Sequence, residues 1–373
     1  MSTGIVAIQL HQLPYNGDWL RVISTVFFVL NVALFVLFTV ISCARYIAYP
    51  ELFRAVLRHP HQSLFLGAFP VGLATILNMV VLVCAPVWGQ GWVTLAWVLW
   101  WIDGVLALVI CFQMAFVIMS NRKSDLAAMT ALWLIPIMSV VIVSSSGGLL
   151  AAALPNPEHR LWTLIISYVL WGIGMPLAWM ILVLYFVRLT IHEPPPREVI
   201  VSVFLPIGPL GLGVFSLVSL GKVARDLFPT TKSLPTVANA GDMLYVVSFF
   251  VALIMWGFAL IWFFIAVATI AESSRVPFNM GWWGFVFPLG IFALSTSAIG
   301  LELESRFFKV LGTLVWQVLT ACVVLLWIIV AVRTVQRSFT GTMFFAPCLG
   351  TDMKAKQLRV RKLEGDTDVE KLA

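Results

Sequence analysis

The sequence predicts an all-α polytopic membrane protein, built as a ten-helix bundle of five tandem helical hairpins around a central pore. Composition predicts the class: 61% of the 373 residues are hydrophobic and 11% are charged, whereas soluble domains carry roughly 25% charged residues. The mean hydropathy is +1.00. The apolar residues also occur in runs of about 20 or more, which is the length that a membrane-spanning helix needs.

Nine apolar segments are long enough to span a bilayer. Polar or proline-rich stretches separate them, such as 121–125 and 192–197. We therefore predict a transmembrane transporter domain over 1–340 and a charged cytoplasmic tail over 341–373. The predicted spans are about 20–45, 62–86, 92–120, 126–153, 161–189, 198–221, 240–271, 281–300 and 307–335.

The first residues form about half of a span. Residues 1–13 are mildly apolar and stop at the turn signal Pro14-Tyr15-Asn16-Gly17. One interpretation is a short re-entrant or interfacial segment. The other, which we favour, is the remainder of a first helix that is truncated in this chain, which brings the number of spans to ten.

Helix-breaking and hydroxyl residues alternate between spans when this segment counts as the first. The odd-numbered spans hold most of the Pro, Gly, Ser and Thr, and the even-numbered spans are bulkier, except for the sixth with Gly172 and Pro176. The third and ninth spans share a motif, Phe69-Pro70-Val71-Gly72 and Phe287-Pro288-Leu289-Gly290. Pro and Gly are common in membrane helices generally, but a repeating hairpin explains the alternation. Because a freed backbone group is costly in lipid, the broken helices should lie inside and the smooth ones outside.

Charged side chains are nearly absent from the span interiors. No Lys, Arg or His lies near the middle of a span, and a single carboxyl group does, that of Asp103. A charge at that depth costs about 2.5–3.5 kcal/mol on insertion scales. Two interpretations stay open: Asp103 fixes helix packing through hydrogen bonds, or it takes part in proton coupling or gating.

The uncharged spans favour a small anion as the solute. A cation pump usually needs several buried acids, and a tight dianion site is helped by a buried Arg. The groups left to stabilise a solute are hydroxyl groups, backbone N–H groups at helix breaks and helix N-termini. Each helix N-terminus stabilises a nearby anion by about 0.3–1 kcal/mol. Such weak, distributed donors suit the passage of an oxyanion. The predicted anion path consists of Ser2, Thr3, Gly4, Phe69, Gly72, Thr75, Ser145, Ser146, Gly208, Gly211, Pro288 and Gly290, with Phe287 as the pore gate.

Other function classes find little support in the sequence. The five cysteines show no metal-ligand spacing, and no catalytic motif is present. We therefore expect no enzyme activity, no metal and no cofactor. The net charge of +6 resides in loops beside spans, so nucleic acid is not an expected partner. A receptor without transport activity is the alternative from another class.

Basic residues are distributed unequally between the two sides of the predicted membrane. With ten spans, the loops after even-numbered spans share a side with the tail. That side holds sixteen Lys and Arg residues, and the other side holds seven. The positive-inside rule therefore predicts a cytoplasmic tail.

These motifs resemble the fungal sulfite efflux pumps, whose superfamily includes the bacterial tellurite-resistance protein, the yeast malate permeases and the guard-cell slow anion channels. The resemblance covers nearly the whole chain. It is carried by residues 2–6, 66–76, 99–103 and 207–211, and above all by 279–290, whose sequence is Asn-Met-Gly-Trp-Trp-Gly-Phe-Val-Phe-Pro-Leu-Gly.

The resemblance implies more than the residues show by themselves. It implies a homotrimer with one pore per protomer, lined by the odd-numbered helices and occluded by a Phe that corresponds to Phe287. It also implies export of sulfite or hydrogensulfite across the plasma membrane, which confers sulfite resistance. A C4-dicarboxylate (malate) transporter of the same fold is the alternative, but the second carboxylate would call for a basic residue in the lumen.

Overall fold

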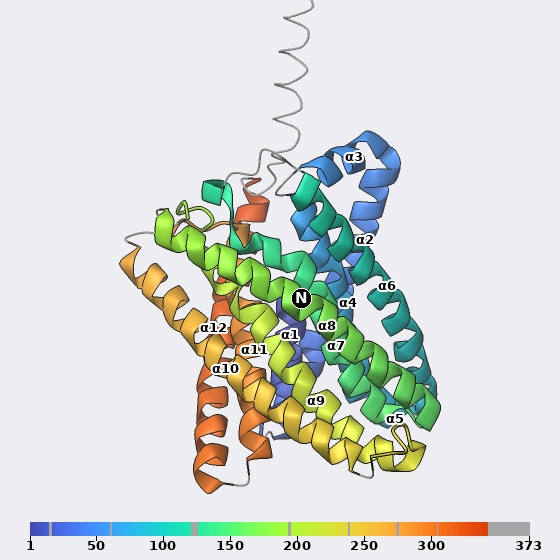
Figure 1. Cartoon of the computed structure of the whole chain (residues 1–373). Coiled ribbons are helices and arrows are strands. Elements are labelled where there is room, and N and C mark those ends of the chain that lie inside the picture. Colours follow the sequence, from blue (N-terminus) through green and yellow to red (C-terminus); the bar gives the residue numbers. More distant parts are fainter. Residues whose placement is uncertain are drawn as a thin grey trace, which may run out of the picture.

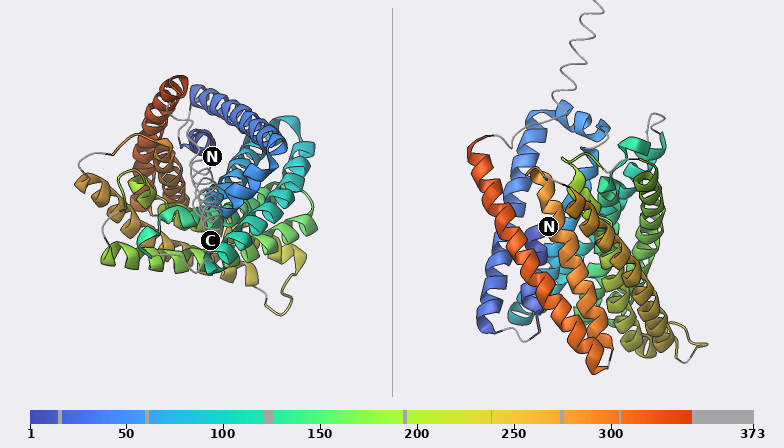
Figure 2. Two further views of the ribbon diagram at one scale, coloured as in Figure 1. Left: turned by 90° about the horizontal axis from the view of Figure 1, so that it is seen from above. Right: turned by 90° about the vertical axis from the view of Figure 1, so that its left-hand side faces the viewer.

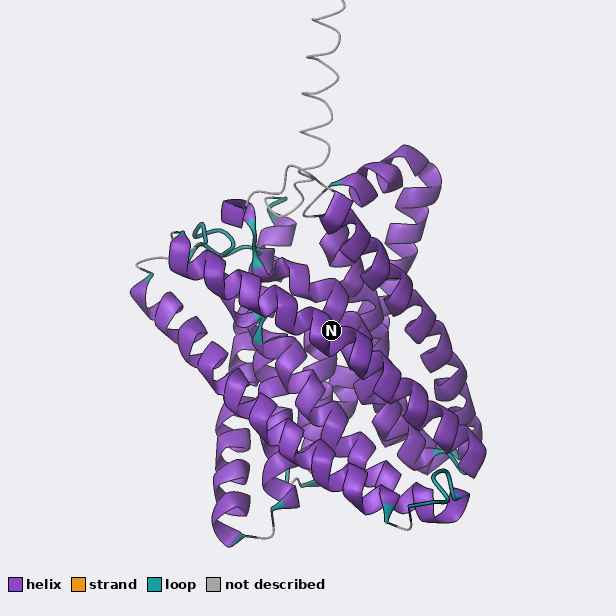
Figure 3. Ribbon diagram, in the orientation of Figure 1, coloured by secondary structure: helices purple, strands orange, loops and turns teal. Residues whose placement is uncertain are grey.

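The chain folds into a bundle of helices (Figures 1 and 3). The computed structural model describes residues 1–14, 17–59, 62–120, 126–192, 195–237, 239–273, 276–303 and 305–341. Within these residues there is no β-strand, and nine helical spans have the length and composition to cross a membrane. The predicted class, an all-α polytopic membrane protein, is therefore confirmed. The predicted tail, 341–373, lies outside the described residues except for Gly341.

In the part of the chain that the structure describes, five helices lie inside the bundle and five surround them, and we call them the inner and outer helices. In α7 and α9, 94% of the most apolar stretch is buried, against 11% in α2 and at most 33% in the other outer helices. The predicted alternation of inner and outer helices is therefore confirmed. The inner helices are α1 (Ser2–Gln12), α4 (Ala68–Met79), α7 (Leu134–Ala153), α9 (Ile207–Thr231) and α11 (Trp283–Glu302). The outer helices are α2 (Asp18–Ala48), α6 (Gln90–Ser120), α8 (Pro157–Ile191), α10 (Ala240–Glu272) and α12 (Arg306–Phe339).

Four inner helices begin with a 3₁₀ turn. These turns are η1 (Ser63–Gly67), η4 (Ala131–Trp133), η5 (Ile200–Phe204) and η6 (Met280–Trp282). Pro70, Pro136 and Pro209 are the third residues of the α-helices that follow η1, η4 and η5. A proline there removes no intrahelical hydrogen bond, because the first N–H groups of a helix have no partner within it. These three prolines therefore lie close to the point where the 3₁₀ turn of their span gives way to the α-helix, whereas Pro288 lies inside its helix.

The third span is irregular at its far end. A π-helical turn, η2 (Val80–Cys84), follows α4 and leads into the short helix α5 (Ala85–Trp88). Turns of this type inside α-helices are frequent at functional sites. The short amphipathic helix α3 (Pro50–Arg58) joins α2 to this span.

The first residues of the chain form an inner helix. Ser2–Leu10 are all buried, and viewed along the bundle α1 lies within the ring of outer helices (Figure 2). Its Gln9 Nε2 donates a hydrogen bond of 2.9 Å to the Gly290 carbonyl of α11. The interfacial placement considered for this segment is therefore wrong, because its residues are enclosed by other helices.

Successive inner helices run parallel to one another. Gly208 near the start of α9 faces Met138 near the start of α7, and Gly148 faces Ser219 further along both helices. This register places equivalent turns of the inner helices at the same depth, so that they can enclose a common space.

The inner helix α9 extends well past its predicted end at 221. It continues to Thr231, and the next residue, Lys232, adopts a left-handed conformation. Beyond 221 the helix carries charged side chains, so the apolar run ends there while the helix does not. Lys222 forms an ion pair with Glu302 at the end of α11, and Tyr245 of α10 donates a 2.6 Å hydrogen bond to the same carboxylate. These contacts join three helices at one end of the bundle.

Substituting Gly67 with alanine should destabilise the protein. A Cβ atom at Gly67 would lie 2.7 Å from Pro136 Cα and 2.9 Å from the Ile135 carbonyl oxygen, both backbone atoms of α7. Overpacking of this kind costs about 1–3 kcal/mol. The check is the thermal unfolding midpoint of the purified protein in detergent. The matched control is Gly257→Ala, where the added methyl meets no atom within 4 Å, and equal midpoints for the two variants would contradict this packing.

Candidate functional site

A cavity of about 20 Å³ lies between the inner helices, which exceeds the roughly 10–15 Å³ that a water molecule needs. Every inner helix contributes to it, together with the π-helical turn η2. The cavity is thus the place where the five inner helices meet. Its lining residues are Ile5, Ile8, Gln12, Thr75, Asn78, Leu82, Ile142, Ser145, Leu149, Leu212, Phe215, Ile291 and Leu294.

The polar groups of the cavity are all neutral. They come from Gln12 on α1, Thr75 and Asn78 on α4, and Ser145 on α7. Thr75 Oγ1 donates to the Gly72 carbonyl at 2.7 Å and accepts from Asn31 Nδ2 at 3.2 Å, so its position is fixed. Hydroxyl and amide groups both donate and accept hydrogen bonds. The lining can therefore solvate a small polar solute, without a fixed charge that would hold it tightly.

Three consecutive serines on α7 face three different surroundings. Ser144 Oγ is 2.7 Å from both the Ser167 carbonyl and Ser216 Oγ. Ser145 lines the central cavity. Ser146 lines a narrow crevice with Asn78 and Trp100, and its hydroxyl has no hydrogen-bond partner among the described residues.

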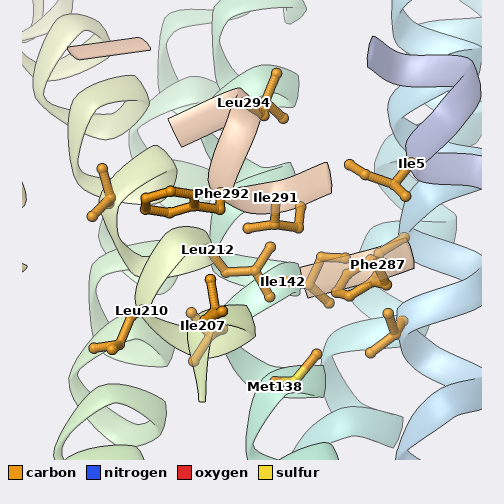
Figure 4. Close-up of a cluster of buried hydrophobic side chains, with 14 of the residues drawn as sticks. Ile5, Met138, Ile142, Ile207, Leu210, Leu212, Phe287, Ile291, Phe292 and Leu294 are labelled. Atoms are coloured by element: carbon orange, nitrogen blue, oxygen red, sulfur yellow. The ribbon is translucent and has the colours of Figure 1, made fainter. Parts of the chain in front are cut away.

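An apolar layer lies one helical turn from the cavity, toward the starts of the inner helices. Phe287 precedes the lining residue Ile291 by four positions, so both lie on one face of α11. Met138 and Gly208 hold the same positions relative to Ile142 and Leu212. Phe287 is completely buried, and Figure 4 shows it in one cluster with Ile142, Leu212 and Ile291. Side chains therefore close the space between the inner helices at this level.

The predicted path residues lie in several places. Thr75 and Ser145 line the cavity, and Ser146 lines the crevice beside it. Ser2 Oγ donates to the Trp283 carbonyl at 3.2 Å, and Thr3 Oγ1 accepts a 3.1 Å hydrogen bond from Trp327 Nε1.

The remaining predicted residues lie at contacts between helices. A Cβ atom on most of the predicted path glycines would collide with neighbouring side chains, as at Gly211, where it would lie 2.7 Å from Ile291 Cγ2, and at Gly72 it would make a tight contact of 3.3 Å. Phe69 packs against Phe35 of α2 with ring centroids 5.0 Å apart and is 39% exposed. Pro288 is buried within α11. The other path glycines and the partners they face are Gly4 with Thr75, Gly72 with Phe35, Gly208 with Met138, and Gly290 with Ile5.

Sequence reasoning missed two polar residues of the cavity, Gln12 and Asn78. Asn78 follows Thr75 by three positions in an otherwise apolar run, and this spacing puts both side chains on one helix face. That pattern could have identified Asn78. Gln12 ends a helix of only eleven residues, too short for a periodic pattern to show which face is polar.

Asp103 lies outside the central cavity. It is fully buried near the middle of α6, and neither carboxyl oxygen has a hydrogen-bond partner among the described residues. Over the same described residues, no three His, Cys, Asp or Glu side chains gather in a metal-binding arrangement.

Comparisons with known proteins cover nearly the whole chain. The voltage-dependent anion channel (SLAC1) family model matches residues 1–335. The sulfite efflux pump SSU1 of Arthroderma benhamiae is 46% identical over 344 residues, which make up 92% of this chain and 90% of that protein. The pump of the same name from Candida albicans is 29% identical over 84% of this chain and 68% of that protein. The malic acid transport protein of Schizosaccharomyces pombe is 26% identical over 86% of this chain and 73% of that protein.

These relatives are transport proteins by name, and each match covers more than four fifths of this chain. The family match agrees with the bundle of inner and outer helices described above. The chain is a member of the voltage-dependent anion channel (SLAC1) family.

Proposed function

We propose that this chain exports sulfite or hydrogensulfite across the plasma membrane, along a path between the five inner helices. The observation that carries the proposal is the 46% identity over 92% of the chain to a sulfite efflux pump, since the malic acid transport protein is only 26% identical. The neutral, donor-containing cavity supports the same solute class.

The chemistry of the cavity favours a singly charged oxyanion. The cost of moving an ion out of water rises steeply with its charge, and the lining residues provide no cation to offset that cost for a dianion. Asn78 and Ser145 offer N–H and O–H donors, and their oxygens can accept the proton of hydrogensulfite. Malate at neutral pH carries two carboxylates and would lack a basic partner here.

Phe287 is the proposed pore gate. Its ring lies one turn from the cavity on the lining face of α11 and is completely buried. Opening then requires that the ring moves away from the lining face of α11. The remaining predicted path residues support this route indirectly, since they set the packing of the inner helices around it.

The orientation and assembly follow from the sequence and the resemblance. The excess of basic residues on the side of the tail supports a cytoplasmic C-terminus. Many of those basic residues, including Arg122, Lys123 and Arg275, lie outside the described residues. A homotrimer is the assembly that the resemblance implies, with one path in each protomer.

The decisive experiment is efflux from proteoliposomes that contain the purified chain. Vesicles loaded with sulfite should lose it faster than protein-free vesicles, and vesicles loaded with malate should not. Efflux of malate without efflux of sulfite would transfer the assignment to the dicarboxylate alternative. Efflux of neither anion would overturn the proposal.

A further inference from the structure

The buried face of the outer helix α6 contains one carboxyl group. This face runs from Val93 to Met114 and is otherwise apolar or small. Asp103 lies near its centre and is completely buried. No other residue of α6 is charged. The helix thus places one acidic group deep in the bundle, with no surface exposed to the solvent.

The inner elements that pack against α6 carry no charge that could neutralise an ionised Asp103. The helix contacts α4, α5, α7 and the turns η1 and η2. Within these described elements the only titratable side chain is Cys84 of η2, and none carries a positive charge. On α6 itself the other titratable group is Cys111.

The outer helix α8 also approaches α6, but its charged residues lie far along the helix from Asp103. Trp97 Nε1 donates a 2.9 Å hydrogen bond to Thr163 Oγ1, and Trp97 stacks on His159 with centroids 4.3 Å apart. The sequence of α8 contains no charged residue between Arg160 and Arg188. Neither carboxyl oxygen of Asp103 has a hydrogen-bond partner among the described residues.

We infer that Asp103 is a proton-binding site, which holds its proton while the bundle is closed and releases it when α6 separates from α4 and α7. A carboxylate without a cation, water or hydrogen-bond donors is strongly disfavoured in an apolar interior. The packing around Asp103 therefore favours the protonated, neutral carboxylic acid. Ionisation requires that the interface opens enough to admit water.

A hydrogen bond connects the helix that carries Asp103 to the wall of the central cavity. Trp100, one turn from Asp103, donates its indole N–H to the Val143 carbonyl of α7 at 2.8 Å. Val143 lies between Ile142 and Ser145 in the sequence, and both of those residues line the cavity. A movement of α6 that pulls on this hydrogen bond therefore also displaces the part of α7 that lines the cavity.

Infrared spectroscopy of the wild-type protein tests the proton directly. At neutral pH the spectrum should contain the carbonyl band of a protonated carboxylic acid, which shifts in D₂O and disappears in Asp103→Asn. Asp103→Glu should retain the band at a shifted position. The matched control is Asp242→Asn, an exposed aspartate in the first turn of α10, which should leave the band unchanged. Absence of the band in the wild-type protein would overturn the inference.

Stability provides a second readout that does not depend on transport. An unfolded Asp releases its proton above about pH 4, whereas the folded protein retains it. The unfolded state then binds fewer protons, so the wild-type unfolding midpoint should fall as the pH rises. Asp103→Asn should remove this part of the pH dependence, and Asp242→Asn should keep it. The same slope in all three proteins would contradict a proton held at Asp103.

Measurements of sulfite flux test whether the proton site is coupled to transport, and this test rests on the proposed function. Asp103→Asn mimics the neutral acid at every pH and should favour the closed bundle. The ratio of its sulfite flux to the wild-type flux, measured at the same pH so that sulfite speciation cancels, should fall as the pH rises. A constant ratio would refute the coupling to the cavity. Loss of sulfite flux in the wild-type protein would instead refute the proposed function, and the infrared band would still decide the proton site.

Discussion

Replacing Phe287 with alanine should raise the basal anion flux at least about tenfold, which corresponds to roughly 1.4 kcal/mol in the barrier. The ring is completely buried one turn from the cavity. Its removal leaves space on the lining face of α11, at the level of Met138 and Gly208, where side chains now close the inner helices. The measurement is efflux from proteoliposomes in the absence of any activating condition.

The control for this prediction is Phe292→Ala on the same helix. Phe292 is also buried, but its ring faces α10 and stacks on Phe263 with centroids 5.4 Å apart. Truncation of a buried Phe costs about 3–5 kcal/mol of stability, so both variants should unfold more easily. Only Phe287→Ala should increase basal flux. An equal rise in both variants would show that flux follows loss of stability, and no rise in either would show that Phe287 only packs the core.

Replacing Asn78 with leucine should lower sulfite flux by roughly 10- to 100-fold. The substitution keeps the number and branching of the side-chain heavy atoms and removes the hydrogen-bonding groups from the cavity. A hydrogen bond to a charged partner contributes about 1.5–3 kcal/mol, and a loss of that size in the barrier gives this range of rates. The measurement is sulfite efflux at matched amounts of folded protein.

A conservative variant separates this role from a structural one. Asn78→Ser restores a donor and an acceptor at the same position, so its flux should exceed that of the leucine variant. If the Asn78→Leu variant transports sulfite at the wild-type rate, Asn78 does not belong to the anion path. Equal, reduced flux in both variants with unchanged unfolding midpoints would show that the size of the side chain matters and its hydrogen bonds do not.

The sequence predicted the class of fold and the division into inner and outer helices because both depend on averages over many residues. Bilayer thickness sets the span length, and the cost of a freed backbone group in lipid disfavours helix breaks on the outside of the bundle, although α8 contains Gly172 and Pro176. α9 shows where such averages fail. Its apolar run ends near 221, but the helix continues to Thr231 with charged residues that pair at the end of the bundle.

The lining of the cavity was harder to predict, because it depends on how each helix is rotated about its own axis. Gly211 and Gly290 lie where neighbouring helices approach closely, so their small size serves packing. Asn78, by contrast, lines the cavity from within an apolar run. The sequence located the buried acid Asp103, but only the packing of α4 and α7 shows that it has no partner.

The central claim is that an anion passes between the five inner helices, and cysteine modification during sulfite efflux tests it most directly. In a background from which the five native cysteines have been removed, Ser145→Cys places a thiol in the cavity wall. A small anionic thiol reagent should block flux through this variant, and excess sulfite should slow the block. Val169→Cys, 51% exposed on the outer helix α8, should be unaffected. Full sulfite flux after complete modification of the Ser145→Cys thiol would contradict the path.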